Sequence, residues 1–216
     1  MLWMAHLLTG LVLAQTTPSD TSATLDNRID RPSVPSTTMA SESGPGSIWV
    51  NPANIAFDKD PRHGLFIQTS PDDGLSSLGL VLGVGGVSFG INNYRNLGDG
   101  RDWTLDYSAS ATTTGHLSFG TTTRLHLTRD VQNFVTYDFG IAWRPTPWFG
   151  LASVARNVKR KNPQGMSPPV TGLGLALRPF GKFAVVGVDY TRTFRLEPMD
   201  AWTTSLRIRP MRGLYV

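Results

Sequence analysis

Side chains that could perform catalysis or bind a metal occur in this chain, but their spacing favours neither. Serine, histidine and aspartate are all present, yet no G-x-S-x-G run occurs that would expose a serine nucleophile on a sharp turn. His116 and His126 fall on one face of a strand, but ten residues of extended chain would hold them roughly 33 Å apart, too far to share a metal ion. His63 lies in another segment. We therefore expect no enzyme, no catalytic residue, no metal site and no cofactor.

The glycines between residues 79 and 90 superficially resemble a phosphate-binding loop. The run G-V-G-G-V lacks the lysine and the following helix pattern that such a loop needs. We expect Gly85 and Gly86 to form a tight hairpin turn. The other glycines would lie in strands and leave room on one face.

The elements that must position these residues are strands. In the run from Val135 to Arg144 the odd positions are large and apolar, and the even positions are small, polar or charged. Side chains of a strand alternate between faces, so this run predicts one apolar face. The pattern recurs in segments of about ten residues, and no apolar run reaches the ~18 residues of a membrane helix. Strands of this kind are typical of a transmembrane β-barrel.

A soluble β-sandwich also alternates, but strand length and the small residues of the second face favour the barrel. Charged residues make up only 17% of the chain and cysteine is absent. We expect an all-β antiparallel transmembrane barrel with about ten visible strands and an eleventh beginning at Gly213. Aromatic residues near strand ends (Trp103, Trp143, Phe180, Tyr190) would contact the lipid interface. The strands are expected at residues 64–70, 75–84, 86–95, 102–113, 116–128, 133–144, 148–158, 170–179, 182–192 and 201–209.

One hairpin predicts a specific register. Both faces of residues 102–128 match if the turn centres on Gly115, with Thr114-Gly115-His116 as a three-residue loop. Asp106 then lies opposite Arg124, and Thr104 lies opposite His126. We therefore expect an inward-facing polar pair of Asp106 and Arg124, in which the opposite charges stabilise the sheet by ~0.2–1 kcal/mol.

Three Arg-Pro pairs recur at hairpin spacing: Arg144-Pro145, Arg178-Pro179 and Arg209-Pro210. Proline cannot donate to a strand ladder, so each pair should end a strand. Barrels usually have short turns on one rim and longer loops on the other. We expect the Arg-Pro turns on the periplasmic rim, and the loops 95–101 and 158–168 outside the cell.

The N-terminal part differs in composition. Residues 1–14 resemble a secretory signal peptide, with an apolar stretch from Leu7 to Ala14. Residues 1–6 hold no Lys or Arg, which leaves open a truncated or misannotated start. Residues 15–46 are rich in Ser, Thr, Pro and Asp, so we expect a disordered periplasmic lead. A hatch-like segment would follow at 47–61, and the barrel strands at 62–216, truncated at the C-terminal side.

The formal charge is +4 and the sequence pI about 9.7, but basic residues are scattered and form no nucleic-acid motif. We therefore expect no nucleic-acid partner. One basic cluster comprises Arg156, Lys159, Arg160 and Lys161. Two interpretations of it stay open: a solvated loop, and contact with anionic lipopolysaccharide at the outer surface.

The most distinctive local stretch is S-I-W-V-N-P-A-N-I-A-F, residues 47–57. Asn-Pro favours a turn and bars helix at Asn51. Apolar residues flank it on both sides, including Trp49 and Phe57. The segment would either fold back and plug the lumen or form a plain turn on the barrel rim.

Asn51, Pro52 and Ala53, followed by N-I-A-F, resemble the N-terminal hatch of the long-chain fatty-acid transporter (FadL) superfamily of outer-membrane barrels. Its members include toluene-transporter-like channels and PorV-type barrels of a secretion system. The longer run S-I-W-V-N-P-A-N-I-A-F-D, with R-P-T-P-W-F-G-L and L-R-P-F later, is similar to the barrel ahead of large signal-peptide peptidases in some Gram-negative bacteria. The resemblance covers residues 47–216.

The resemblance implies a cell outer-membrane protein in contact with lipid, with about fourteen strands and the hatch inside. Its members pass small hydrophobic molecules, so Asn51, Pro52, Ala53, Trp49 and Phe57 would gate a channel for such ligands. A barrel edge open in lipid would expose unpaired backbone. We therefore expect an incomplete barrel, a smaller closed one or an oligomer.

A second hypothesis is a non-catalytic membrane-anchoring barrel of a larger protein such as a signal-peptide peptidase. No peptidase residues are present to carry over. A third hypothesis is a soluble β-sandwich that binds a ligand.

Overall fold

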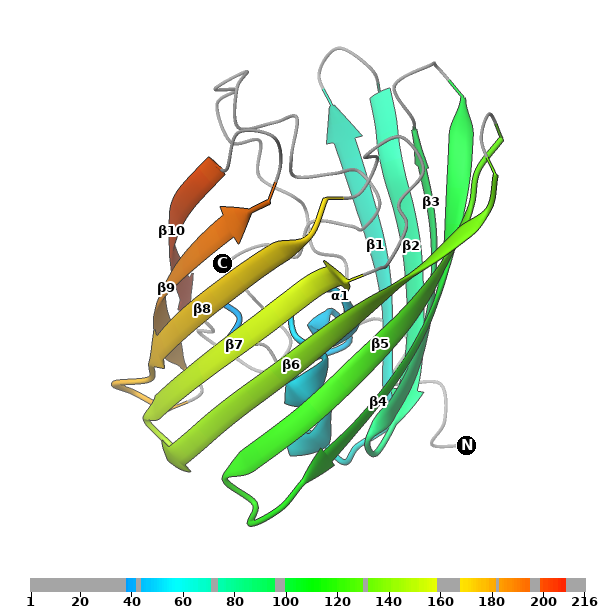
Figure 1. The fold of residues 1–216 in the computed structure, drawn as a ribbon. Coiled ribbons are helices and arrows are strands. Elements are labelled where there is room, and N and C mark those ends of the chain that lie inside the picture. Colours follow the sequence, from blue (N-terminus) through cyan, green and yellow to red (C-terminus); the bar gives the residue numbers. More distant parts are fainter. Residues whose placement is uncertain are drawn as a thin grey trace, which may run out of the picture.

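The computed structural model describes residues 38–41, 44–70, 74–95, 100–129, 132–158, 168–181, 183–194 and 199–208. Ten strands form one antiparallel sheet, in which each strand pairs with the next along the chain. Two short helices, α1 (Ser47–Val50) and the 3₁₀ helix η1 (Pro52–Phe57), precede the sheet. The sheet curves around these helices (Figure 1), and we call the side that faces them the concave face.

The sequence pattern placed all ten strands, each within two residues of its observed bounds. An eleventh strand from Gly213 would lie outside the described residues. The strands are β1 (Arg62–Ser70), β2 (Gly74–Val84), β3 (Val87–Arg95), β4 (Arg101–Thr112), β5 (Leu117–Leu127), β6 (Phe134–Thr146), β7 (Phe149–Val158), β8 (Val170–Leu177), β9 (Ala184–Thr193) and β10 (Met199–Ile208).

The described strands do not close into a barrel. β1 and β10 are the two edge strands of the sheet and do not pair with each other. Figure 1 shows them at the two ends of the curved sheet. The prediction of an all-β antiparallel sheet is therefore confirmed, whereas closure is not found in the described part of the chain.

The two faces of the sheet have opposite character. On β6 the side chains of Tyr137, Phe139 and Ile141 are 42%, 49% and 46% exposed on the outer face, while Thr136 and Asp138 are buried on the concave face. No second sheet of the described residues covers these three apolar side chains. Apolar residues thus point outward and polar residues inward, the reverse of a soluble globular domain.

The two ends of the sheet carry different connections. One end, the turn rim, has the turns at 85–86, 113–116, 147–148 and 178–183, and the other end is the loop rim. Arg144-Pro145 lies in the last residues of β6, and Arg178-Pro179 directly follows β8, so both pairs lie at the turn rim. Arg209-Pro210 lies outside the described residues.

Two glycine turns match their sequence predictions. Val84 pairs with Val87, so Gly85 and Gly86 form a two-residue turn, and Gly85 has a φ of +57°. The turn after β4 centres on Gly115, whose φ is +75°. Positive φ angles are readily adopted only by glycine. These turns therefore fix the registers of the two hairpins.

Candidate functional site: two segments inside the curved sheet

The segment α1–η1 is built by local sequence. Asn51 is extended, with φ of −157°, as expected before a proline, and its side-chain oxygen accepts a hydrogen bond from the Ala53 N–H. Pro52 begins η1, a position where its missing N–H costs nothing. The Asn-Pro-Ala run is thus a capped turn that joins two short helices.

This segment lies on the concave face, against β4, β5 and β6. The Ser118 hydroxyl donates to the Ala53 carbonyl at 2.8 Å, and the Asn51 amide donates to the Ile141 carbonyl at 3.4 Å. A Cβ atom at Gly120 or Gly140 would overlap Pro52 or Asn51. Two glycines of the sheet therefore make room for the Asn-Pro-Ala turn, which is not a plain turn on the rim.

Trp49 anchors α1 to the sheet. Its ring is 2% exposed and packs edge-on against Phe66, with the ring centroids 5.0 Å apart. Its Nε1–H donates to Asp106 Oδ2 at 2.8 Å. Trp49 thus joins an apolar contact to a polar one, a combination that suits a buried indole.

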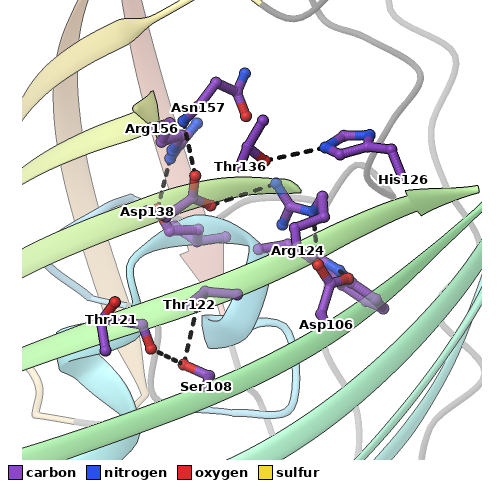
Figure 2. A network of polar contacts seen from close by, with 12 residues as sticks. Asp106, Ser108, Thr121, Thr122, Arg124, His126, Thr136, Asp138, Arg156 and Asn157 are labelled. Carbon is purple, nitrogen blue, oxygen red and sulfur yellow. Dashed lines mark hydrogen bonds and ion pairs between the residues drawn. The ribbon is translucent and has the colours of Figure 1, made fainter. Parts of the chain in front are cut away.

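Asp106 also belongs to a buried ion network (Figure 2). Asp106 lies opposite Arg124, and Thr104 lies opposite His126, as the Gly115-centred register predicted. Arg124 Nε is 2.5 Å from Asp106 Oδ1, and both side chains are fully buried. The inward-facing pair is therefore confirmed as a geometric prediction.

Sequence reasoning missed the third member of this network. Arg124 Nη1 lies 3.4 Å from Asp138 Oδ2 on β6, and Asp138 Oδ1 accepts the Asn157 N–H at 2.9 Å. Arg124 pairs with Thr136 across β5 and β6, so Asp138 is its diagonal neighbour. Extending the hairpin register by one strand would have found this carboxylate.

The three histidines in the described part of the chain are not gathered at one site. His126 stacks on Phe134 with the ring centroids 4.2 Å apart, and its Nε2 lies 3.0 Å from the Thr136 hydroxyl. His63 and His116 are exposed. Within the described residues no group of three His, Asp or Glu side chains is placed to hold a metal ion.

A second segment, Thr38 to Ser41, lies on the concave face of β7–β9. All four residues are at most 3% exposed. The Met39 N–H donates to both carboxylate oxygens of Asp189, at 3.2 and 3.0 Å, and Arg178 Nη2 donates to the Ala40 carbonyl at 3.0 Å. Hydrogen bonds from the sheet thus hold a segment that has little apolar surface of its own.

Part of the expected lead therefore lies against the sheet. The disordered lead was expected to run to residue 46, with the folded part from Ser47, but residues 38–41 are buried and 44–46 are also described. The two segments also touch each other, because the Asn54 side chain donates to the Met39 carbonyl at 2.7 Å. Residues 1–37 of the expected signal peptide and lead lie outside the described residues.

Arginines of the sheet also bind the segment 47–57 and Asp58, which follows it. Arg62 donates to the Ile55 and Asp58 carbonyls. Arg144 donates to the Asn54 side-chain oxygen at 3.0 Å, and its guanidinium lies 4.1 Å from the centroid of the Phe57 ring. All five residues expected in the hatch thus lie in one segment that the sheet holds from several sides.

The expected basic surface cluster must be corrected at Arg156. This side chain is half-buried and donates to the Val50 carbonyl at 2.5 Å. It belongs to β7 and faces the concave side, because Arg156 is two residues after the inward-facing Val154 in the same strand. Lys159, Arg160 and Lys161 lie outside the described residues.

No helix among the described residues is long and apolar enough to cross a membrane. Comparison with protein-family models, with curated proteins and with solved structures gives no match. The arrangement itself defines the class of site: a curved sheet that holds two backbone segments of its own chain against a polar concave face.

Proposed function

We propose that this chain forms part of the wall of an outer-membrane β-barrel and that segments 38–41 and 47–57 plug it. Small hydrophobic molecules would bind or pass when the plug moves. The observation that carries this proposal is the exposure of large apolar side chains over the whole outer face. Leu82, Phe89, Leu173 and Leu206 are each between 54% and 58% exposed, which water would disfavour and lipid would favour.

Aliphatic side chains and two further aromatic ones, Tyr107 and Phe139, lie in the middle of the outer face. Exposed aromatic side chains also lie near both rims, where outer-membrane barrels contact the lipid interfaces. Towards the loop rim these are Trp103, Tyr137 and Trp202, and towards the turn rim they are Phe119, Trp143, Trp148, Phe180 and Phe183. On β4, Trp103 is eight residues from Ala111, which pairs with Phe119. That separation is about 26 Å along the strand, or about 20 Å along the membrane normal for a strand tilted by ~40°, so it spans most of the ~25 Å apolar band of outer-membrane barrels.

The proposed channel requires β1 and β10 to pair with further strands, because open edges in lipid would leave backbone groups unpaired. The resembled family has about fourteen strands and places its hatch inside. In this chain the corresponding turn is held by Ser118, Ile141 and the two glycines beneath it. Asn51, Pro52 and Ala53 would gate the channel by leaving this position, together with Trp49 and Phe57.

The filled concave face favours a second candidate function. Trp49, Ile55 and Arg124 are at most 2% exposed, so the plug is packed tightly rather than loosely. A barrel that stays closed would serve as a non-catalytic membrane anchor for a larger protein, such as a signal-peptide peptidase. In this case the network of Asp106, Arg124 and Asp138 would stabilise a permanently closed barrel and would not control movement of the plug.

The test uses the full chain expressed in a Gram-negative host. We expect it in the detergent-extracted outer-membrane fraction, and we expect proteoliposomes that contain it to take up a hydrophobic fluorescent tracer. A lock is available because the chain has no cysteine: the ideal Cβ of Gly140 lies 3.1 Å from Asn51 Cγ. Oxidised Asn51→Cys/Gly140→Cys should lose uptake and regain it on reduction, whereas each single-cysteine variant should not respond.

The outcomes separate the three hypotheses. Outer-membrane recovery without uptake in any state would overturn the channel and support the anchor. Recovery from the aqueous periplasmic fraction without detergent would overturn both and support a soluble β-sandwich.

A further inference from the structure

Charge is distributed unevenly along the concave face. Four inward-facing arginines lie at the turn rim, Arg62, Arg144, Arg178 and Arg207, and no inward-facing carboxylate of the described strands lies there. The inward-facing aspartates lie in the middle of the sheet or towards the loop rim: Asp102, Asp106, Asp138 and Asp189. The turn rim is thus the cationic end of this face.

Three of these arginines lie at this rim on β6, directly after β8 and on β10. The ideal Cβ of Gly150 would lie 3.3 Å from Arg178 Nη1 and 3.6 Å from Arg144 Cγ, so the Arg178 guanidinium and the aliphatic stem of Arg144 both lie over this glycine. The Arg144 guanidinium itself lies against Asn54 and Phe57. Arg207 pairs with Val185 on β9, and the register of β8 with β9 places Arg178 on the other side of Val185. Two strand spacings put the Arg178 and Arg207 backbones about 10 Å apart, within reach of two arginine side chains.

The charge of Arg178 is not balanced by the group to which it donates. Its side chain is 9% exposed, and its hydrogen bond goes to the Ala40 carbonyl at 3.0 Å. A carbonyl satisfies the donor but carries no net charge, and no carboxylate of the described residues pairs with Arg178. Burial, and then the charge of Arg207, lower the pKa of the Arg178 guanidinium. A bound anion would oppose both effects, because a nearby opposite charge favours the charged form of the guanidinium.

We propose that Arg144, Arg178 and Arg207 form a binding site for a phosphate-type oxyanion inside the turn rim. Three guanidinium groups from different strands offer donors from several directions. This geometry suits the tetrahedral oxygens of phosphate better than a planar carboxylate, which one guanidinium fork can satisfy. The Ala40 carbonyl oxygen occupies one acceptor position of this site. The ligand is free inorganic phosphate or the phosphate of a lipid headgroup.

The test is titration calorimetry on the full chain in non-ionic detergent at constant ionic strength, with chloride as the reference anion. The probes are inorganic phosphate and a short-chain phosphatidic acid. We expect phosphate-specific binding that weakens at least tenfold in Arg178→Gln and in Arg207→Gln, since each removes charge-assisted hydrogen bonds. The control is Arg192→Gln, which removes an outward-facing arginine from β9 near the loop rim and should bind as the parent chain does.

Binding of both probes assigns the site to free phosphate, and binding of the lipid alone assigns it to a headgroup. Arg178→Lys keeps the charge without the fork and should show intermediate affinity, which keeps the test valid if Arg178→Gln does not fold. The proposal is overturned if the parent chain binds neither probe more tightly than chloride. It is equally overturned if Arg178→Lys and Arg207→Gln bind as tightly as the parent.

Discussion

Two buried arginines on the same concave face are treated in opposite ways. Arg124 lies between Asp106 and Asp138 beneath the segment 47–57, whereas Arg178 donates to the neutral carbonyl of Ala40 in the segment 38–41. We call the part of the sheet that holds the segment 47–57 the first seat, and the part that holds the segment 38–41 the second seat. The first seat is a charge network that joins three strands and Trp49. The second relies on a carboxylate that accepts one backbone N–H and on glycines that leave space. We infer that the first seat contributes more to stability and that the second is easier to vacate.

The largest effect should come from breaking the charge network. Arg124→Met removes the cation and leaves two carboxylates facing each other in a buried site. We expect the free energy of unfolding to fall by about 3–5 kcal/mol, measured by denaturant titration in detergent micelles with tryptophan fluorescence. Adding Asp106→Asn and Asp138→Asn to this variant should recover much of the loss. A change below about 1 kcal/mol in the single variant would contradict a network of this strength.

The next effect should come from Trp49, which connects the same network to α1. Trp49→Phe keeps an aromatic ring against Phe66 but removes the donor to Asp106 Oδ2. Leaving a buried acceptor with one bond fewer should cost about 2 kcal/mol, and amide exchange at Asn51 and Ala53 should speed up. Phe66→Leu is the matched control, because it weakens the apolar contact and leaves the hydrogen bond in place. Unchanged exchange in Trp49→Phe would show that the bond does not hold the segment.

The network also shows which parts of this fold can be predicted from residue alternation and hairpin turns in the sequence. Alternation placed the ten strands, and the single glycine turn at Gly115 fixed the Asp106–Arg124 pair, because face and register within a hairpin follow from neighbouring residues. Asp138 could have been found by extending the same register argument from β5 to β6. The outward-facing apolar residues were likewise encoded by position along each strand.

The second seat could not be predicted in this way. Met39 and Asp189 are 150 positions apart, and nothing near residue 39 indicates burial, because Thr, Met, Ala and Ser bring little apolar surface. A composition test for disorder assumes that a segment must supply its own burial energy. Here the glycines and charged groups of β7–β9 supply the seat. Arg156 was misplaced for a related reason: its neighbours Lys159 to Lys161 suggested a loop, while strand alternation continued past Val154.

A smaller and more local effect is expected at this second seat. Asp189→Asn keeps the size of the side chain but replaces its charge, so the Met39 N–H loses a charge-assisted acceptor. We expect a loss of about 1 kcal/mol and faster amide exchange at Met39 and Ala40 only. The matched comparison is Trp49→Phe, whose exchange should change around Asn51 instead. If Asp189→Asn speeds exchange equally in both segments, the two seats are one cooperative unit and the proposed difference between them is wrong.

The smallest effect should come from an ion pair with the same chemistry on the other face. Arg192 and Asp200 approach to 3.7 Å on the outer face near the loop rim, and their side chains are 46% and 51% exposed. Water and ions screen such a pair, so a double-mutant cycle of Arg192→Ala and Asp200→Ala should give a coupling energy below about 1 kcal/mol. The same cycle on Arg124 and Asp106 should give a clearly larger value, because those charges have no access to water. Equal coupling in the two cycles would mean that burial does not set the strength of ion pairs in this sheet, and the contrast between Arg124 and Arg178 would then lose its physical basis.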